Sequence, residues 1–246
     1  MTRDGDREDR SSRSAAAFTG LVLALVFAVI VLAGLGLWQV ERRTWKLGLI
    51  DQIDTRIHAA PAPVPGPEDW SGIGADKDAY RHVQAVGSFL DVPPTFTQAT
   101  TALGGGYWVL SPLKTHKGFV VLVNRGFVLP GQRGTVGNAF GPAEVTGLLR
   151  VSEPEGGFLH SNDPSDDRWY SRDVDAIAQK RGLKDVAPYF IDADKGSPDA
   201  VPVGGLTVVD LPNNHFVYAL TWFALAIMAV AGLVFLIRDE RKARRG

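Results

Sequence analysis

The residue in this sequence best suited to chemistry is His215, in the segment NNHFVYALTWFALAI from Asn213 to Ile227. It stands where a long apolar run begins, and a neutral imidazole is the commonest side-chain ligand for metals. A second interpretation places His215 in an interfacial belt. Trp and Tyr collect at both headgroup levels of a bilayer, and a histidine there loses little solvation. The residues alone leave both interpretations open.

No other group of residues matches a catalytic or metal-binding pattern. The chain lacks H-E-x-x-H, any other ligand-spaced histidine pair and a G-x-S-x-G nucleophile elbow. It has no cysteine, which excludes disulfides, thiolate metal sites and cysteine nucleophiles. Its net charge of -1 offers no basic surface for nucleic acid. We therefore expect a protein that is not an enzyme and has no catalytic residue. The scattered histidines are His58, His82, His116 and His160.

Three short motifs have plainer structural interpretations. The GGG run at 104–106 lacks a following helix, so a flexible turn is favoured over a phosphate cradle. The acidic SNDPSDD stretch at 161–167 lacks EF-hand spacing and is typical of a solvated turn. In NRGF at 124–127, between two apolar strands, Gly126 predicts a tight turn or bulge rather than a catalytic Arg125.

Two long runs without a charged residue predict the elements that carry the candidate site. One extends from Ser14 to Val40 and the other from Leu211 to Ile237. Each exceeds the roughly 20 apolar residues that span a bilayer, and a helix satisfies its own backbone groups in lipid. The first run could instead be a cleaved signal peptide, but it is longer than a typical apolar signal core. Two transmembrane helices are the expected result.

Charged tails predict the orientation of these helices. The basic cluster after the second run belongs in the cytoplasm, which puts both termini there and the middle segment in the periplasm. A basic cluster after the first run would instead favour a cytoplasmic middle segment; it consists of Arg42, Arg43 and Lys46. The adjoining loop, however, is far longer than the about 60 residues for which this charge rule holds. Acids in the amino-terminal tail are untypical of a mitochondrial presequence, so a bacterial inner membrane is expected. The expected regions are a cytoplasmic tail 1–14, a transmembrane helix 15–40, a periplasmic domain 41–214, a transmembrane helix 215–237 and a basic cytoplasmic tail 238–246.

The middle segment is mostly strand, in short Val-, Phe-, Tyr- and Leu-rich runs bounded by Gly, Pro and Asn. One helix is expected after Ser171 as its cap, with Gly182 as its stop. A Pro/Ala stretch at 59–67 is expected to run extended as a spacer or surface loop. Because strands and helix do not alternate, the expected fold class is α+β, with a mainly antiparallel sheet or partial barrel. The expected strands are 80–90, 107–110, 119–123 and 145–150.

Aromatic and cationic residues gather near His215 at the outer membrane boundary. At helical spacing, Tyr218 and Trp222 share one face of the second span with His215. Trp38 and Gln39 of the first span are expected at the same depth.

Beside them, Arg42, Arg43 and Lys46 could pair with the propionates of a haem. A neutral imidazole is a good axial ligand for haem iron. The composition permits a haem site without requiring one.

Five ordered blocks between the two spans resemble the Surfeit locus protein 1 family of cytochrome oxidase assembly factors. The similarity extends over nearly the whole chain from Gly34 to the basic tail. One departure is Phe127 in NRGFVLP, where the family often has tryptophan, and Leu129 intervenes before Pro130. The blocks are GLGLWQVERRTWKLGLI at 34–50, YRHVQAVGSF at 80–89, VLVNRGFV at 121–128, VTGLLR at 145–150 and NNHFVYALTWF at 213–223.

The resemblance implies an integral inner-membrane factor that acts in biogenesis of haem-copper cytochrome c oxidase, in the respiratory chain. Bacterial members resemble haem a carriers that help insert this cofactor into oxidase subunit I. Through the pattern H-x-x-Y-A-x-T-W-F, the haem-associated histidine of the family matches His215, and its tryptophan-glutamine pair matches Trp38 and Gln39.

The expected function is therefore that of a chaperone that holds haem a transiently, as cargo, and delivers it during oxidase assembly. Expected partners are subunit I, haem a synthase and the lipid bilayer, with no nucleic acid. The alternative is an interaction protein that stabilises an oxidase assembly intermediate without holding haem. The expected site residues are His215 as iron ligand, with Trp38, Gln39, Tyr218, Trp222 and Arg42 around the cofactor.

Overall fold

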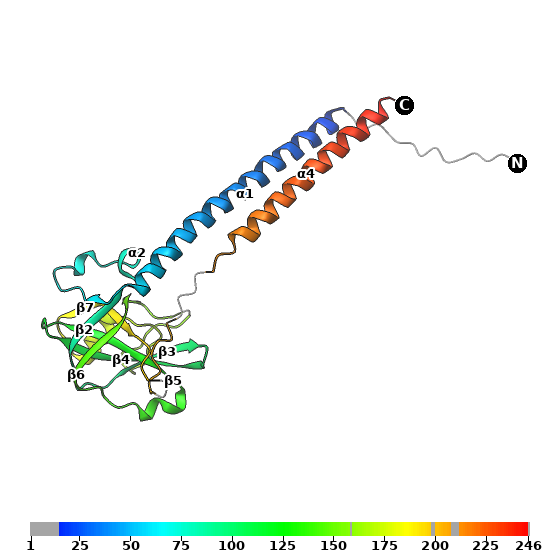
Figure 1. The fold of residues 1–246 in the computed structure, drawn as a ribbon. Coiled ribbons are helices and arrows are strands. Elements are labelled where there is room, and N and C mark those ends of the chain that lie inside the picture. Colours follow the sequence, from blue (N-terminus) through cyan, green and yellow to red (C-terminus); the bar gives the residue numbers. More distant parts are fainter. Residues whose placement is uncertain (1–14, 158, 198–199, 208–211, 246) are drawn as a thin grey trace. The chain divides into compact units, whose positions relative to one another are not determined.

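The structure is a computed structural model that describes residues 15–157, 159–197, 200–207 and 212–245. It divides into two compact units. The first contains most of the first long helix and all of the second, which lie side by side in Figure 1. The second unit, residues 51–210, is a β domain together with the last turns of the first helix. Each unit is described by itself.

Helix α1 (Ala15–His58) begins in the first apolar run and continues well past its end. We expected the first span to close at residue 40 and the following domain to begin at 41. The chain instead stays helical to His58, because residues 41–58 contain no proline and a single glycine. Pro61 follows shortly after the helix ends, in keeping with the bias against helix before proline.

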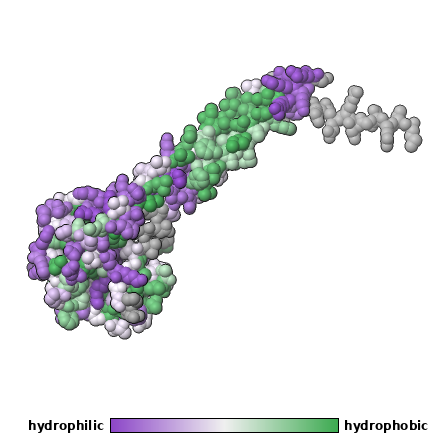
Figure 2. Space-filling model, in the orientation of Figure 1, coloured by the Kyte–Doolittle hydropathy of each residue, from purple (hydrophilic) through white to green (hydrophobic). Residues whose placement is uncertain are grey.

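Helix α4 (His215–Ala243) begins at the histidine singled out above. Asn214 is its N-cap residue, and the Asn214 carbonyl accepts hydrogen bonds from the amides of Val217 and Tyr218. Both helices are long and apolar enough to cross a membrane. Figure 2 shows hydrophobic side chains covering the greater part of this helix pair.

The β domain is mainly sheet, as expected, and the four predicted strand runs correspond to β2, β4, β5 and β6. Three strands were not predicted, namely β1, β3 and β7. The strands are β1 (Ala62–Pro63), β2 (His82–Phe89), β3 (Thr95–Thr101), β4 (Gly104–Thr115), β5 (Val120–Val128), β6 (Gly141–Val151) and β7 (Val186–Ala193). Short helical turns are η1 (Trp70–Gly72), α2 (Ala75–Asp78) and η2 (Pro130–Thr135).

The sheet closes on itself to form a small barrel. The strand order is β1-β2-β6-β7-β5-β4-β3, and an additional pairing joins β2 to β4. Most pairs are antiparallel, but β5 pairs with β7 in parallel and β1 pairs with β2 in parallel. Closure leaves β1 and β3 outside the ring of paired strands.

Two hydrophobic clusters fill opposite faces of the sheet. On β5, Val121 and Val123 contribute to one cluster and Leu122 to the other, because successive side chains of a strand point to opposite faces. Val64, in the Pro/Ala stretch at 59–67, packs into the first cluster at 5% exposure. This stretch is therefore extended, as expected, but part of it is packed against the barrel.

Helix α3 (Val174–Arg181) covers the second cluster with Val174 and Ile177. Its cap is Asp173, whose carboxylate accepts a hydrogen bond from the Ala176 amide, so the expected cap at Ser171 was wrong by two residues. Gly182 ends the helix with a φ of 64°, as predicted, because glycine adopts this left-handed conformation without steric cost.

Of the two predictions made for glycine motifs, the turn at 104–106 was wrong and the bulge at Gly126 is confirmed. The GGG run at 104–106 is not a turn but the first part of β4, where it pairs with Ala99, Thr100 and Thr101. Gly126 lies in a β bulge, as predicted. Between Asn124 and Phe127, β5 contains one residue more than the stretch of β4 that it pairs with.

Candidate functional site

One hydrogen bond joins the two apolar helices close to the start of α4. His215 Nδ1 lies 2.7 Å from Oε1 of Gln39 in α1. Gln39 is 9% exposed, and the contact joins residues 176 positions apart in the sequence. Gln39 needs this partner, because its amide left alone would be buried without a hydrogen bond.

Small residues allow the two helices to approach where this contact forms. Gly36, one turn before Gln39, lies against the ring of Phe223. Ala219 and Ala226 of α4 are 2% and 8% exposed, which places them on the buried side of the helix pair. Close approach at small residues is the usual way in which apolar helices pack in lipid.

The contact with Gln39 determines what His215 can do. The amide oxygen of Gln39 is an acceptor, so Nδ1 of His215 donates and carries the ring proton. In the neutral imidazole with this tautomer, the lone pair of Nε2 is free to bind a metal. Metal-ligating histidines usually donate their other ring N–H to a carbonyl or carboxylate, which fixes the tautomer and the ring orientation.

Two arginines lie one turn beyond Gln39. The guanidinium of Arg43 is 5.4 Å from the ring centroid of Phe216, which follows His215, and that of Arg42 is 4.0 Å from the ring of Trp45. Among the described residues neither arginine forms an ion pair with a carboxylate. Their positive charges are therefore available to an anionic group near His215.

The helix pairing does not bring all of the expected site residues together. Trp38 is 54% exposed and Tyr218 is 56% exposed, whereas Trp222 is half-buried. The side of α1 that meets α4 is the side of Gly36 and Gln39, and Trp38 lies about 100° around the helix from Gln39. The two exposed rings are thus open to the surroundings of the helix pair.

Sequence reasoning missed two residues of this site. Gly36 was not singled out, although a small residue one turn from a buried glutamine is the signal of a close helix contact. Asn213 was not considered at all. Both polar atoms of its side chain are buried without a hydrogen-bond partner in the part of the chain that the structure describes.

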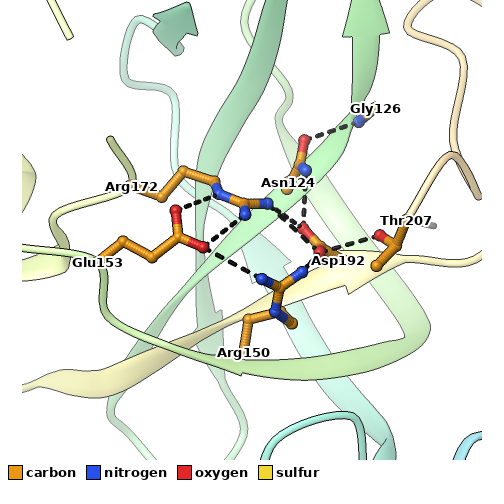
Figure 3. Close-up of polar contacts among 7 residues, drawn as sticks. All are labelled: Asn124, Gly126, Arg150, Glu153, Arg172, Asp192 and Thr207. Carbon is orange, nitrogen blue, oxygen red and sulfur yellow. Dashed lines mark hydrogen bonds and ion pairs between the residues drawn. The ribbon is translucent and has the colours of Figure 1, made fainter. Parts of the chain in front are cut away.

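The β domain contains a second polar cluster, centred on Asp192 of β7 (Figure 3). The Asp192 carboxylate accepts hydrogen bonds at 2.8–3.0 Å from Asn124, Arg150, Arg172 and Thr207. Glu153 completes the cluster, with Arg172 Nη2 2.6 Å from its carboxylate. The two arginines and two acids neutralise one another, so this cluster fastens strands and loops together and leaves no charge for a ligand.

The NRG motif belongs partly to this cluster. Asn124 donates to Asp192 and accepts from the amide of Gly126 at 3.1 Å. Gly126 has a φ of 133°, and a Cβ there would lie 2.4 Å from the carbonyl carbon of Val203, so only glycine fits. The Arg125 guanidinium donates a hydrogen bond to the backbone carbonyl of Gly137, and burial lowers the pKa of Arg125. The motif is thus explained by backbone geometry.

The other histidines do not form a metal site. Within the described residues there is no group of three or more His, Cys, Asp or Glu side chains placed to hold a metal ion. His82 hydrogen bonds to the Ala59 carbonyl and to Asp194, and His160 stacks on Tyr170 with ring centroids 4.9 Å apart. His215 is therefore the histidine with an apolar setting and a free ring nitrogen.

The class defined by this fold is an α+β protein in which two helices apolar enough to cross a membrane accompany a closed β domain. The sequence profile described as "SURF1 family" matches residues 26–227, and the chain belongs to this family. Its members are known in general as cytochrome oxidase assembly factors.

Individual relatives agree with this assignment over most of the chain. Surfeit locus protein 1 of Rattus norvegicus is 33% identical over 223 residues, which cover 82% of this chain and 70% of the rat protein. The Homo sapiens protein of the same name is 32% identical, with 82% and 72% covered. A SURF1-like protein of Monosiga brevicollis is 31% identical, with 89% and 88% covered.

Proposed function

We propose that the chain binds haem a and assists its insertion into subunit I of cytochrome c oxidase, with His215 as the iron ligand. The observation that carries the proposal is the hydrogen bond from His215 Nδ1 to Gln39, which leaves Nε2 free for a metal. A histidine whose other nitrogen is fixed by an amide oxygen has the arrangement expected of an axial ligand.

The residues around His215 fit a haem as ligand. A porphyrin needs apolar surroundings for its macrocycle and cations near its carboxylates. The helices supply the first, and Arg42 and Arg43 supply unpaired guanidinium groups. Trp222 is half-buried on the His215 side of α4, and the exposed rings of Trp38 and Tyr218 are available to a macrocycle bound against the helix pair.

We further propose that both helices cross a bacterial inner membrane, with both termini in the cytoplasm and the β domain in the periplasm. The basic end of α4, with Arg241 and Lys242 in its last turn, supports this orientation. Reporter fusions after Gly246 and near Gly105 test it. A reporter that works only in the periplasm should be active at the second position and silent at the first.

The proposed partners are subunit I and haem a synthase, which would receive and supply the haem, together with the lipid bilayer. Haem a is cargo, held transiently, and no covalent step is assigned to the chain. A deletion strain should therefore make the oxidase subunits but load less haem a into them. Normal haem a content of the oxidase in that strain would count against the proposal.

The decisive experiment compares His215→Ala with His116→Ala. Both proteins are purified from cells that make haem a, and haem content is measured by absorption per folded molecule. His215→Ala should lose the haem, whereas His116→Ala should retain it, because His116 is exposed on a turn of the β domain. Equal haem content in both variants would leave His215 an interfacial residue and favour the alternative, an assembly factor that does not hold haem.

A further inference from the structure

Asn213 has an unusual environment for an amide side chain. Its Oδ1 and Nδ2 are both buried, and neither has a hydrogen-bond partner among the described residues. Trp70, Thr97 and Ser111 also have an unpaired buried polar atom, but each has one, and each belongs to the β domain. Buried polar groups are nearly always paired, so an amide with neither atom satisfied needs a reason.

The position of Asn213 relates it to the candidate haem site. It immediately precedes the N-cap residue Asn214 and lies two residues before His215. Two residues of chain span at most about 7 Å, so its Cα lies within that distance of the His215 Cα. It belongs to the same compact unit as His215 and Gln39.

The local helix start does not explain the buried amide. The capping position is held by Asn214, which is exposed and meets the Val217 and Tyr218 amides through its backbone carbonyl. A side chain that served only to start α4 would hydrogen bond to the first amides of the helix. Asn213 does not, so its donor and acceptor have no partner among the described residues and are left for a ligand.

We infer that Asn213 determines which haem the site accepts, by donating a hydrogen bond from Nδ2 to the formyl oxygen of haem a. This inference rests on the proposed function. Haem a carries a formyl group where haem b carries a methyl, and a formyl oxygen is a pure acceptor. A buried donor without a partner favours a ligand that offers an acceptor and disfavours one that offers a methyl in its place.

The test measures haem preference with the full-length protein in detergent micelles. Wild type, Asn213→Ala and Asn214→Ala are each titrated with haem a and separately with haem b. The wild type should bind haem a about tenfold more tightly than Asn213→Ala does, because the variant lacks the hydrogen bond. Asn213→Ala should lose that factor for haem a and keep its affinity for haem b, whereas Asn214→Ala should match the wild type for both.

A spectroscopic signature separates this role from a structural one. In resonance Raman spectra of bound haem a, loss of the hydrogen bond should move the formyl C=O stretch to higher frequency in Asn213→Ala only. The thermal midpoint of the haem-free protein should not fall, because the replaced amide has no partner to lose. If the alanine variant fails to fold, Asn213→Leu keeps nearly the same side-chain volume and serves instead.

Three results would overturn the inference. If Asn213→Ala lost no affinity for haem a, or lost affinity equally for haem a and haem b, Asn213 would be assigned to structure or to lipid contact. An unchanged formyl stretch would show that the amide and the formyl group do not meet. Failure of the wild type to bind either haem would reject the proposed function as well, and this outcome is distinct from the other two.

Discussion

The ring of Phe223 in α4 lies directly over the backbone of Gly36 in α1. A Cβ at Gly36 would stand 2.5 Å from Cε1 of that ring, a separation that real side chains do not adopt. The hydrogen bond between His215 and Gln39 begins one turn further along α1. The glycine therefore determines how close the helices come, and the polar contact depends on that closeness.

Gly36→Val should separate the helices and weaken the proposed haem site. Overpacking of this kind typically costs about 1–3 kcal/mol. The matched control is Gly34→Val, because a Cβ at Gly34 meets nothing within 4 Å. Thermal unfolding and haem content are measured for both variants, and equal behaviour of the two would show that the Gly36 contact has no consequence.

Gln39→Leu should lower the affinity for haem without removing the ligand. Loss of the acceptor frees the His215 ring and its tautomer, and loss of such a supporting group typically costs about 10–100-fold in affinity. Gln39→Glu retains an oxygen acceptor and should bind more tightly than the leucine variant. Titration with haem a measures the effect, and identical affinities for the two variants would disprove a positioning role for the amide.

Asp192→Ala should strongly destabilise the β domain. It would leave Arg150 and Arg172 partly buried with one carboxylate, Glu153, between them, and breaking a buried ion pair costs about 3–5 kcal/mol. Asp194→Ala is the control, because Asp194 is 43% exposed and its pair with His82 is worth about 1 kcal/mol or less. Denaturant unfolding should give a much lower midpoint for the first variant than for the second.

Stability of the β domain should fall as the pH rises above the ordinary pKa of histidine. Burial acts to lower the pKa of His82, but hydrogen bonds to Asp194 and to the Ala59 carbonyl outweigh it and raise the pKa. Both ring nitrogens face acceptors, so the charged imidazolium is the form that satisfies them. Its contribution is fully present below the unfolded value of about 6.5 and is lost as the pH rises through the higher folded value.

Thermal unfolding between about pH 6 and about pH 9 measures this effect, in a range that contains the shifted titration. His82→Gln should show a smaller decrease with pH than the wild type, whereas His116→Gln should follow the wild type. The same pH dependence in His82→Gln and wild type would assign the effect to other groups.

The sequence by itself predicted the helices and strands that are marked by an unbroken run of residues of one kind. An apolar run without charges leaves helix as the form that satisfies its backbone in lipid, so α1 and α4 were predictable. Gly182 marked the end of α3 for an equally local reason, its left-handed backbone. Strands β2, β5 and β6 were predicted because their sequences are rich in the apolar and aromatic residues that favour strands.

Tertiary structure alone decided the pairings. β3 has the sequence TFTQATT, with a single large apolar side chain, and β7 is recognisable only once the sheet places it between β5 and β6, where five of its residues are buried. Which side of α1 meets α4 could not be read from spacing, because both Trp38 and Gln39 were expected near the site and only the close approach at Gly36 selected the side of Gln39. The hydrogen bond from His215 to Gln39 follows from that packing, which joins residues 176 positions apart and so has no local sequence pattern.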